Sequence, residues 1–155
     1  MTGAIRNIHA TAIVVDGRGL LFIGPSGIGK SMAALSCLAI ARRHNVAAAL
    51  VADDQVLVDG RDGRIFASCP AAIAGLMEIR GSGIVHMEHV ETAPLDLAIK
   101  VVSLADTERL PPEDERFQLA GIGVLPMIRL ANTATDPLAV IGAMMPSWRA
   151  QASIW

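Results

Sequence analysis

Apolar and polar positions alternate in blocks along the first third of the chain and predict strands around one long helix. The apolar runs Ile13–Val15 and Leu20–Ile23 flank a turn at residues 16–19 and predict a β-hairpin, whose second strand is buried on both faces. From Lys30 to Arg43 the apolar residues recur at helical spacing, and two closing arginines suit a helix C-terminus. Ala48–Ala52 predicts the next buried strand, which ends at a pair of aspartates.

The middle of the chain carries a second hairpin signal. Gln55–Asp59 and Arg64–Ala67 flank the turn-type residues 60–63. Pro70–Met77 predicts a short helix, and Leu95–Val102 predicts another strand. Several hairpins around one crossover helix predict an α/β fold with a mixed sheet.

The last third predicts one strand and one helix. Gly121–Leu130 contains Pro126, which favours an edge or irregular strand because proline donates no ladder hydrogen bond. Leu138–Met145 predicts the final helix, which Pro146 should end. The tail that follows holds two tryptophans, expected to dock either on the domain's own surface or on a partner.

Between the buried strand and the long helix lies a motif of the phosphate-binding type, Gly24-Pro25-Ser26-Gly27-Ile28-Gly29-Lys30-Ser31. It fits the P-loop pattern, in which backbone N–H groups and a helix N-terminus cradle phosphates. The alternative is a chance glycine-rich turn, which the strand before it and the helix after it argue against. We expect Lys30 to reach the β- and γ-phosphates of ATP and the Ser31 hydroxyl to bind Mg²⁺.

Two more segments carry candidate chemistry. Asp53 and Asp54 end a strand next to the predicted P-loop helix, where ligand groups gather in open α/β sheets; the alternative is a helix cap or a solvated turn. Residues 78–84, Glu-Ile-Arg-Gly-Ser-Gly-Ile, place an acid, a base and two glycines between apolar flanks. Those glycines permit tight turns near a ligand, but taken alone the segment could equally be an ordinary loop.

Composition narrows the class of protein. At 155 residues, 52% hydrophobic and 18% charged, the chain predicts one globular domain spanning residues 1–155. A net charge of −2 with no basic run gives no reason to expect a nucleic-acid or membrane partner. Two cysteines are too few for a disulfide framework, and we find no leader or membrane-spanning segment. These features predict a soluble, cytoplasmic protein.

Four separated segments together resemble one family, the catalytic domain of HPr kinase/phosphorylase, which phosphorylates a serine of the phosphocarrier protein HPr. They are His9 before the first strand, the P-loop at 24–31, Val-Ala-Asp-Asp at 51–54, and residues 78–84, which resemble the family's own signature. Glu-Arg-Leu-Pro at 108–111 is similar to a further family segment. The resemblance extends from Ile8 to about Met144.

The resemblance implies a role for each matching residue. Gly24–Ser31 would hold ATP, with Lys30 on the transferring phosphoryl group. Asp54 would be the base that takes the proton of the substrate serine, with His9 as its partner. Arg109 matches the catalytic arginine. Mg²⁺ would be held by Ser31, Glu78 and Asp53. Such an arrangement suits phosphoryl transfer, which needs alignment and charge neutralisation more than covalent help.

The chain also departs from the family pattern. It begins where the catalytic domain would begin, so we expect no accessory N-terminal domain. In place of the family's Pro-Val-Arg-Pro-Gly-Arg, associated with phosphorolysis of phosphoserine-HPr, residues 131–136 read Ala-Asn-Thr-Ala-Thr-Asp. Because attacking phosphate needs positive charge to bind, we predict weak or absent phosphorylase activity. The region that grips HPr is shorter here. Hexamers are usual in the family, and we expect some homo-oligomer.

Two other functions compete with an HPr(Ser) kinase. A P-loop kinase of a small molecule would need an arginine-rich lid or an acceptor pocket, for which Arg80 and Arg109 are the candidates. A non-catalytic ATP-sensing module is the third alternative. A base beside the γ-phosphate argues against it, because binding alone requires none.

Overall fold

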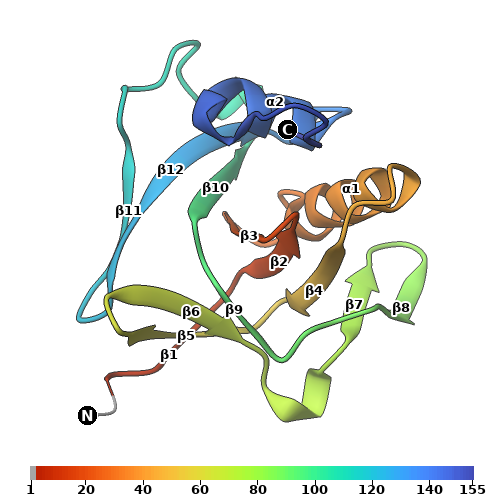
Figure 1. Cartoon of the computed structure of the whole chain (residues 1–155), viewed down its shortest axis with the longest axis vertical. Helices are drawn as coiled ribbons and strands as arrows, with labels where there is room; N and C mark the ends of the chain where they lie inside the picture. The colour runs from red at the N-terminus through yellow and green to blue at the C-terminus, as the bar shows by residue number, and fades with distance from the viewer. Residues whose placement is uncertain (1–2) are drawn as a thin grey trace.

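The chain folds into a mixed six-stranded sheet with helices on one face and a smaller sheet on the other (Figure 1). A computed structural model describes residues 3–155. The central sheet has the order β11-β12-β10-β3-β2-β4 and contains β2 (Thr11–Val15), β3 (Arg18–Ile23), β4 (Ala48–Ala52), β10 (Leu97–Val102), β11 (Arg116–Leu119) and β12 (Gly123–Ala131). β3, β10 and β12 run parallel, whereas β2 and β11 are antiparallel to their neighbours. The predicted mixed sheet is confirmed.

Two smaller sheets complete the strand content. The four-stranded antiparallel sheet has the order β1-β5-β6-β9, from β1 (Arg6–Ile8), β5 (Val56–Arg61), β6 (Arg64–Ser68) and β9 (Thr92–Pro94). A separate hairpin joins β7 (Leu76–Ile79) to β8 (Gly83–His86). The helices are α1 (Lys30–Arg43) and α2 (Pro137–Met144), with short 3-10 turns at Ala71–Ile73, Leu104–Asp106 and Pro146–Trp148.

Alternate side chains of the central strands enter two cores. Leu20 and Phe22 of β3 pack with residues of α1 and α2, whereas Leu21 packs against the four-stranded sheet on the opposite face. Because both faces are covered, the central strands are continuously apolar, as the sequence run Leu20–Ile23 predicted. The first hairpin, the second hairpin and the α1 boundaries are all found as predicted.

One predicted helix needs correction. The helix predicted at Pro70–Met77 is only a 3-10 turn, and Met77 lies in strand β7. The physical reason is Gly75, whose φ of +76° ends the turn and whose Cα lies under the His89 ring, where a Cβ would be 2.7 Å from Nδ1. Local alanine-rich propensity is therefore overridden by the turn that leads into β7.

Of the two alternatives predicted for the strand around Pro126, an edge strand or an irregular one, the structure shows the irregular one. β12 lies between β10 and β11, but its two halves pair differently. Residues 123–126 pair with β11, and residues 127–131 pair with β10. Pro126 therefore lies where β12 has a neighbour on one side only, which is the local environment a proline requires.

The C-terminal segment packs on the chain itself. Trp148 is buried against the α1–α2 core, and its ring meets that of Trp155 edge to face with centroids 5.0 Å apart. The Arg18 guanidinium lies 4.7 Å from the centre of the Trp148 ring. Of the two predicted docking places for the tryptophans, the structure shows the domain's own surface.

Cys37 on α1 gives the fold a pH-dependent contribution to stability. It is fully buried, and desolvation, followed by the charge of Asp136, raises the pKa of its thiol from 9.0 to about 12. Because the pKa of the thiol is higher in the folded than in the unfolded state, the neutral thiol contributes its full stabilisation below pH 9. This stabilisation is lost progressively as the pH rises above that value. We expect the unfolding free energy to fall above pH 9 by up to about 1.4 kcal/mol per pH unit from this group. Denaturant titrations give the unfolding free energies of the wild type and Cys37→Ala between pH 8 and 10.5. The difference between the two proteins should shrink as the pH rises. A difference that stays constant with pH would contradict a raised pKa at Cys37.

Candidate active site

The phosphate-binding motif forms a tight loop between β3 and the N-terminus of α1. Three of its glycines have left-handed φ angles: +145° at Gly24, +80° at Gly27 and +117° at Gly29, the residue before α1. At Gly24 a Cβ would lie 3.0 Å from the backbone oxygen of Val101, so glycine is needed for both conformation and space. The first N–H groups of α1 have no acceptor within the helix and are available to an anion.

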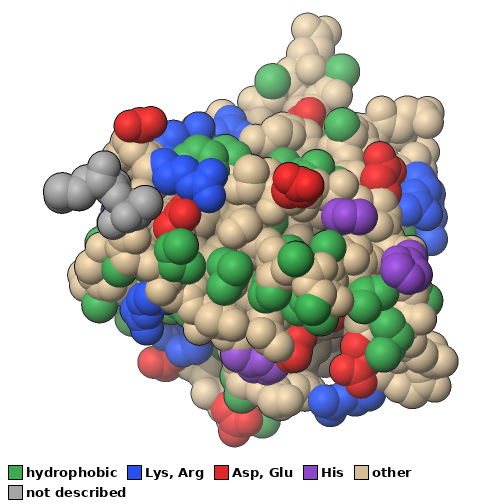
Figure 2. Space-filling model, turned by 90° about the horizontal axis from the view of Figure 1, so that it is seen from below, with side chains coloured by type: hydrophobic (Ala, Val, Ile, Leu, Met, Phe, Trp, Pro, Cys, Tyr) green, Lys and Arg blue, Asp and Glu red, His purple; other side chains and the backbone are tan. Residues whose placement is uncertain are grey.

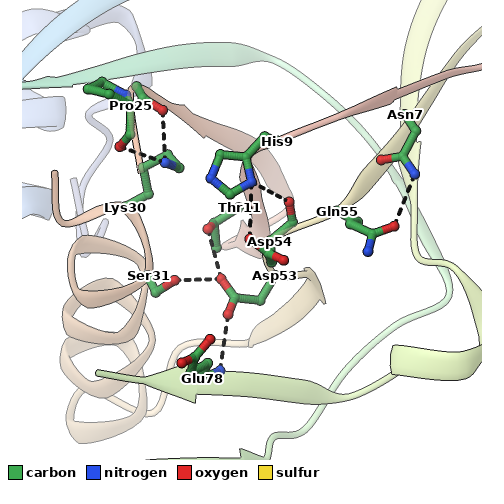
Figure 3. A network of polar contacts seen from close by, with 11 residues as sticks. Asn7, His9, Thr11, Pro25, Lys30, Ser31, Asp53, Asp54, Gln55 and Glu78 are labelled. Atoms are coloured by element: carbon green, nitrogen blue, oxygen red, sulfur yellow. Dashed lines mark hydrogen bonds and ion pairs between the residues drawn. The ribbon is translucent and has the colours of Figure 1, made fainter. Parts of the chain in front are cut away.

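The Lys30 side chain folds back over this loop. Its Nζ donates to the carbonyl oxygens of Gly24 at 2.8 Å and Pro25 at 3.0 Å (Figure 3). Burial lowers the pKa of Lys30, and the carboxylates of Asp54 and Asp53 oppose that shift. The ammonium group is therefore held at the loop, close to both acids.

Asp53 joins three elements at the floor of the site. Its Oδ1 accepts hydrogen bonds from the hydroxyls of Ser31 at 2.6 Å and Thr11 at 2.9 Å. Its Oδ2 accepts from the backbone N–H of Glu78 at 3.1 Å (Figure 3). Asp53 is only 5% exposed, so these donors provide the hydrogen bonds that a buried carboxylate needs.

A β-bulge sets the direction of Asp53. Ala12 of β2 pairs with Ala52 and the next residue, Ile13, pairs with Leu50, so Val51 is an extra residue in β4. An extra residue reverses which face the following side chains point to. Without it, Asp53 would point to the face of the four-stranded sheet; with it, Asp53 faces α1 and Ser31.

Asp54 follows on a strained turn and points into solvent. The N–H of Gln55 donates to the Asp53 carbonyl at 2.8 Å, which closes a three-residue turn around Asp54, whose φ is +71°. A positive φ at the centre of such a turn is uncommon and costs conformational energy. The Asp54 side chain is 62% exposed and is therefore accessible to a second molecule.

His9 is the direct partner of Asp54. Its Nδ1 lies 3.0 Å from Asp54 Oδ1 and 3.1 Å from the Asp54 carbonyl oxygen. Both neighbours are acceptors, so Nδ1 carries the proton. This hydrogen bond fixes the orientation of the Asp54 carboxylate.

These groups line one cavity of about 190 Å³. Of the residues predicted for the site, His9, Ser26, Gly27, Gly29, Lys30, Ser31, Asp53, Asp54 and Glu78 line it. Gly24, Pro25 and Ile28 belong to the same loop but do not line the cavity. Arg109 lies in the exposed 107–112 loop and does not line the cavity.

Three lining residues were absent from the predicted site. Thr11 supports Asp53, but a lone threonine at the start of a strand gives no sequence signal. Met32 follows Ser31 on α1. Arg80 was considered only for a rival function; here its Nη1 lies 2.8 Å from where a Cβ on Gly27 would be, so its guanidinium rests on the phosphate loop.

The donor set at the floor of the cavity fits magnesium. Ser31 Oγ and Asp53 Oδ1 lie 2.6 Å apart, and the exposed Glu78 carboxylate lines the same cavity. Among the described residues no three His, Cys, Asp or Glu side chains converge as a ready-made metal cluster. Mg²⁺ needs none, since it keeps several waters and takes one or two protein oxygens plus substrate phosphates.

One face of the molecule carries charges of both signs. On the face drawn in Figure 2, basic side chains lie in separate groups with acidic side chains between them. Within residues 3–155, no helix combines the length and the apolar character needed to cross a membrane.

The fold and the site together define a P-loop domain on a mixed sheet, in which a buried strand-end acid is bonded to the P-loop serine and a second, exposed acid lies next to it. Residues 3–153 match the model of the family described as HPr Serine kinase C-terminal domain. The chain belongs to that family.

Individual relatives agree with this assignment. The HPr kinase/phosphorylase of Clostridium tetani is 33% identical over 115 residues, which are 74% of this chain and 36% of the relative. The HPr kinase/phosphorylase of Clostridium botulinum (strain Eklund 17B / Type B) is 32% identical over 152 residues, which cover 92% of this chain and 48% of the relative. The chain therefore spans between about a third and a half of the curated relatives it matches.

A solved structure shows the same fold. The Hpr(Ser) kinase/phosphatase from Coxiella burnetii superimposes with a TM-score of 0.74, at 24% identity, covering 92% of this chain and 95% of that one. The expected HPr kinase-like fold is confirmed.

Proposed function

We propose that this chain is an ATP- and Mg²⁺-dependent protein-serine kinase whose acceptor is a serine of an HPr-like phosphocarrier protein. The observation that carries the proposal is the pairing of two acids with different surroundings. Asp53 is buried and bonded to the P-loop serine, whereas Asp54 is exposed, bonded to His9 and held on a strained turn. A protein that only binds the nucleotide needs an acid such as Asp53 next to the P-loop serine, but it does not need a general base such as Asp54.

In the proposed reaction, the hydroxyl oxygen of the acceptor serine bonds to the γ-phosphorus of ATP, and Asp54 accepts the hydroxyl proton. The bond between the γ-phosphorus and the oxygen that bridges it to the β-phosphate breaks, and ADP leaves. His9 keeps the Asp54 carboxylate in position. Lys30 and the N–H groups of the P-loop hold the phosphates in line, and Ser31, Asp53 and Glu78 would hold Mg²⁺. Magnesium, when bound, neutralises charge that spreads over the transferring phosphoryl group. The proposal places this reaction in the cytoplasm, in a homo-oligomer.

The exposure of Asp54 favours a macromolecular acceptor over a small one. A small-molecule kinase encloses its acceptor, whereas here more than half of the Asp54 side chain faces solvent. An acceptor serine on a protein surface can approach such a carboxylate directly.

We further propose that the reverse reaction, phosphorolysis, is weak. Residues 131–136 contain no arginine or lysine, yet they lie beside the phosphate loop. The N–H of Asn132 donates to the Val102 carbonyl at 2.8 Å, and the Asn132 Cβ lies 3.7 Å from where a Cβ on Gly29 would be. Asp136, where the family has its second arginine, instead caps α2 by accepting from the N–H of Ala139 at 3.0 Å.

The prediction is that added phosphate releases little label from phosphoserine-HPr. The purified protein should be incubated with ³²P-labelled phosphoserine carrier and excess inorganic phosphate, and pyrophosphate measured. Thr133→Arg restores one cation without disturbing the Asp136 cap and should increase the rate. Efficient phosphorolysis by the unmodified protein would contradict this part of the proposal.

A further inference from the structure

A clamp centred on Arg129 ties the segment between β10 and β11 to the central sheet at two places, residues 107–108 and residue 115. Arg129 lies on β12 and is only 13% exposed. Its Nε and Nη2 donate to the two carboxylate oxygens of Glu115 at 2.8 and 3.0 Å. Its Nη1 donates to Thr107 Oγ1 at 2.7 Å and to Glu108 Oε2. We call these four residues the Arg129 clamp.

These two places depend on the clamp unequally. We call residues 107–108 the first leg of the loop and residue 115 the second leg. In the second leg, the Glu115 carbonyl oxygen also accepts a hydrogen bond from the backbone N–H of Met127 at 3.0 Å, so this leg is bonded to β12 independently of the Arg129 side chain. In the first leg, the contacts from Thr107 and Glu108 to β12 that the structure describes pass through the Arg129 side chain. Loss of Arg129 should therefore release the first leg and spare the second.

The loop between these legs carries Arg109 and begins at the edge of the sheet where phosphate would bind. The whole segment, residues 103–115, leaves the carboxyl end of β10, whose Val101 oxygen lies 3.0 Å from where a Cβ on Gly24 of the P-loop would be. Arg109 itself is exposed and follows directly after clamp residue Glu108. In Figure 1 the loop stands away from the sheet between β10 and β11.

We propose that Arg129 is a positioning residue, which holds the first leg of this loop so that Arg109 approaches the transferring phosphoryl group in few orientations. This inference rests on the proposed function and adds to it a residue that does not touch the reacting atoms. Fixing the residue next to Arg109 reduces the conformational freedom that must be lost in the transition state.

The chemistry of the clamp requires arginine. A planar guanidinium can bind one carboxylate with two N–H groups and still direct a third nitrogen to Thr107 and Glu108. A lysine at 129 keeps the charge but cannot bridge both legs in this way. Arg129→Lys should therefore behave more like Arg129→Met than like the wild type.

Limited proteolysis tests the clamp without reference to catalysis. Trypsin can cleave after Arg109 in the loop and after Arg116 at the start of β11. In the full chain, Arg129→Met should raise the rate of cleavage after Arg109 about tenfold, as expected from lost hydrogen bonds to charged groups, and leave cleavage after Arg116 slow. The control is Arg61→Met, which removes an arginine paired with Asp59 on β5. Equal rates at Arg109 in all three proteins would overturn the clamp, and thermal unfolding checks that each variant is folded.

A double-mutant cycle tests whether Arg129 acts through Arg109. Arg129→Met should lower kcat for transfer to the phosphocarrier by about ten- to a hundredfold, with KM for ATP unchanged because the P-loop holds the nucleotide. In an Arg109→Ala background the same change should lower kcat no further. Additive losses, or a change confined to KM for ATP, would overturn the positioning role. Absence of transfer by the unmodified protein would overturn the proposed function, and with it that role, whereas the cleavage rates would still decide whether Arg129 holds the loop.

Discussion

Replacing Asp54 by asparagine is expected to lower the rate of phosphoryl transfer by about 10²- to 10⁴-fold, the usual contribution of a general base. Affinity for ATP should change little, because Asp54 belongs to the exposed mouth of the cavity and the P-loop holds the nucleotide. Asparagine is chosen over alanine because it tolerates the left-handed backbone at this position. The measurement is kcat for ATP-dependent labelling of the carrier, with ATP affinity measured separately by calorimetry.

A matched control exists in the turn between β5 and β6. Asp62 also has a positive φ, of +49°, and lies in the second hairpin of the chain without lining the cavity. Asp62→Asn should leave both kcat and ATP affinity at wild-type values. Transfer by Asp54→Asn at the wild-type rate would remove Asp54 from the mechanism.

The second large effect is expected at Lys30. Lys30→Met removes the cation that the P-loop holds for the phosphates and should weaken ATP binding by about 10- to 100-fold, as for a lost charge-assisted hydrogen bond. The fold should tolerate the change. Burial already disfavours the charged amine, methionine fills a similar volume, and Asp53 keeps its bonds to Thr11, Ser31 and the Glu78 N–H.

Lys100 is the matched control because these are the two lysines of the chain. It lies on β10, within the central sheet, and does not line the cavity. Lys100→Met should bind ATP like the wild type. Retention of wild-type affinity by Lys30→Met would mean that the P-loop does not hold the nucleotide's phosphates.

The sequence was sufficient for those parts of the fold that depend on local signals. The strand, loop and helix around residues 20–43 could be predicted because glycine spacing and helical periodicity act within a few residues of one another. The P-loop lysine and serine follow from the same motif. His9 could be selected only through the family resemblance, since a lone histidine has no chemical signature of its own.

Other features depend on contacts between distant segments. The two adjacent aspartates look alike in sequence, but the bulge at Val51 turns Asp53 towards α1 and the strained turn exposes Asp54. Neither feature has a local pattern. The turn before β7 is similar, because Gly75 is required there by the His89 ring, 14 positions further along the chain. The Arg129 clamp joins three segments and was not predicted at all.

The most direct test of the proposed function is transfer of the γ-phosphate of ATP, with Mg²⁺, to an HPr-type phosphocarrier. The carrier and its Ser→Ala variant should be incubated side by side with labelled ATP and the purified protein. The proposed function predicts label on the wild-type carrier and none on the variant. Binding of ATP without labelling of either carrier would contradict the proposed function. The protein would then either transfer phosphate to another acceptor or bind ATP as a non-catalytic switch.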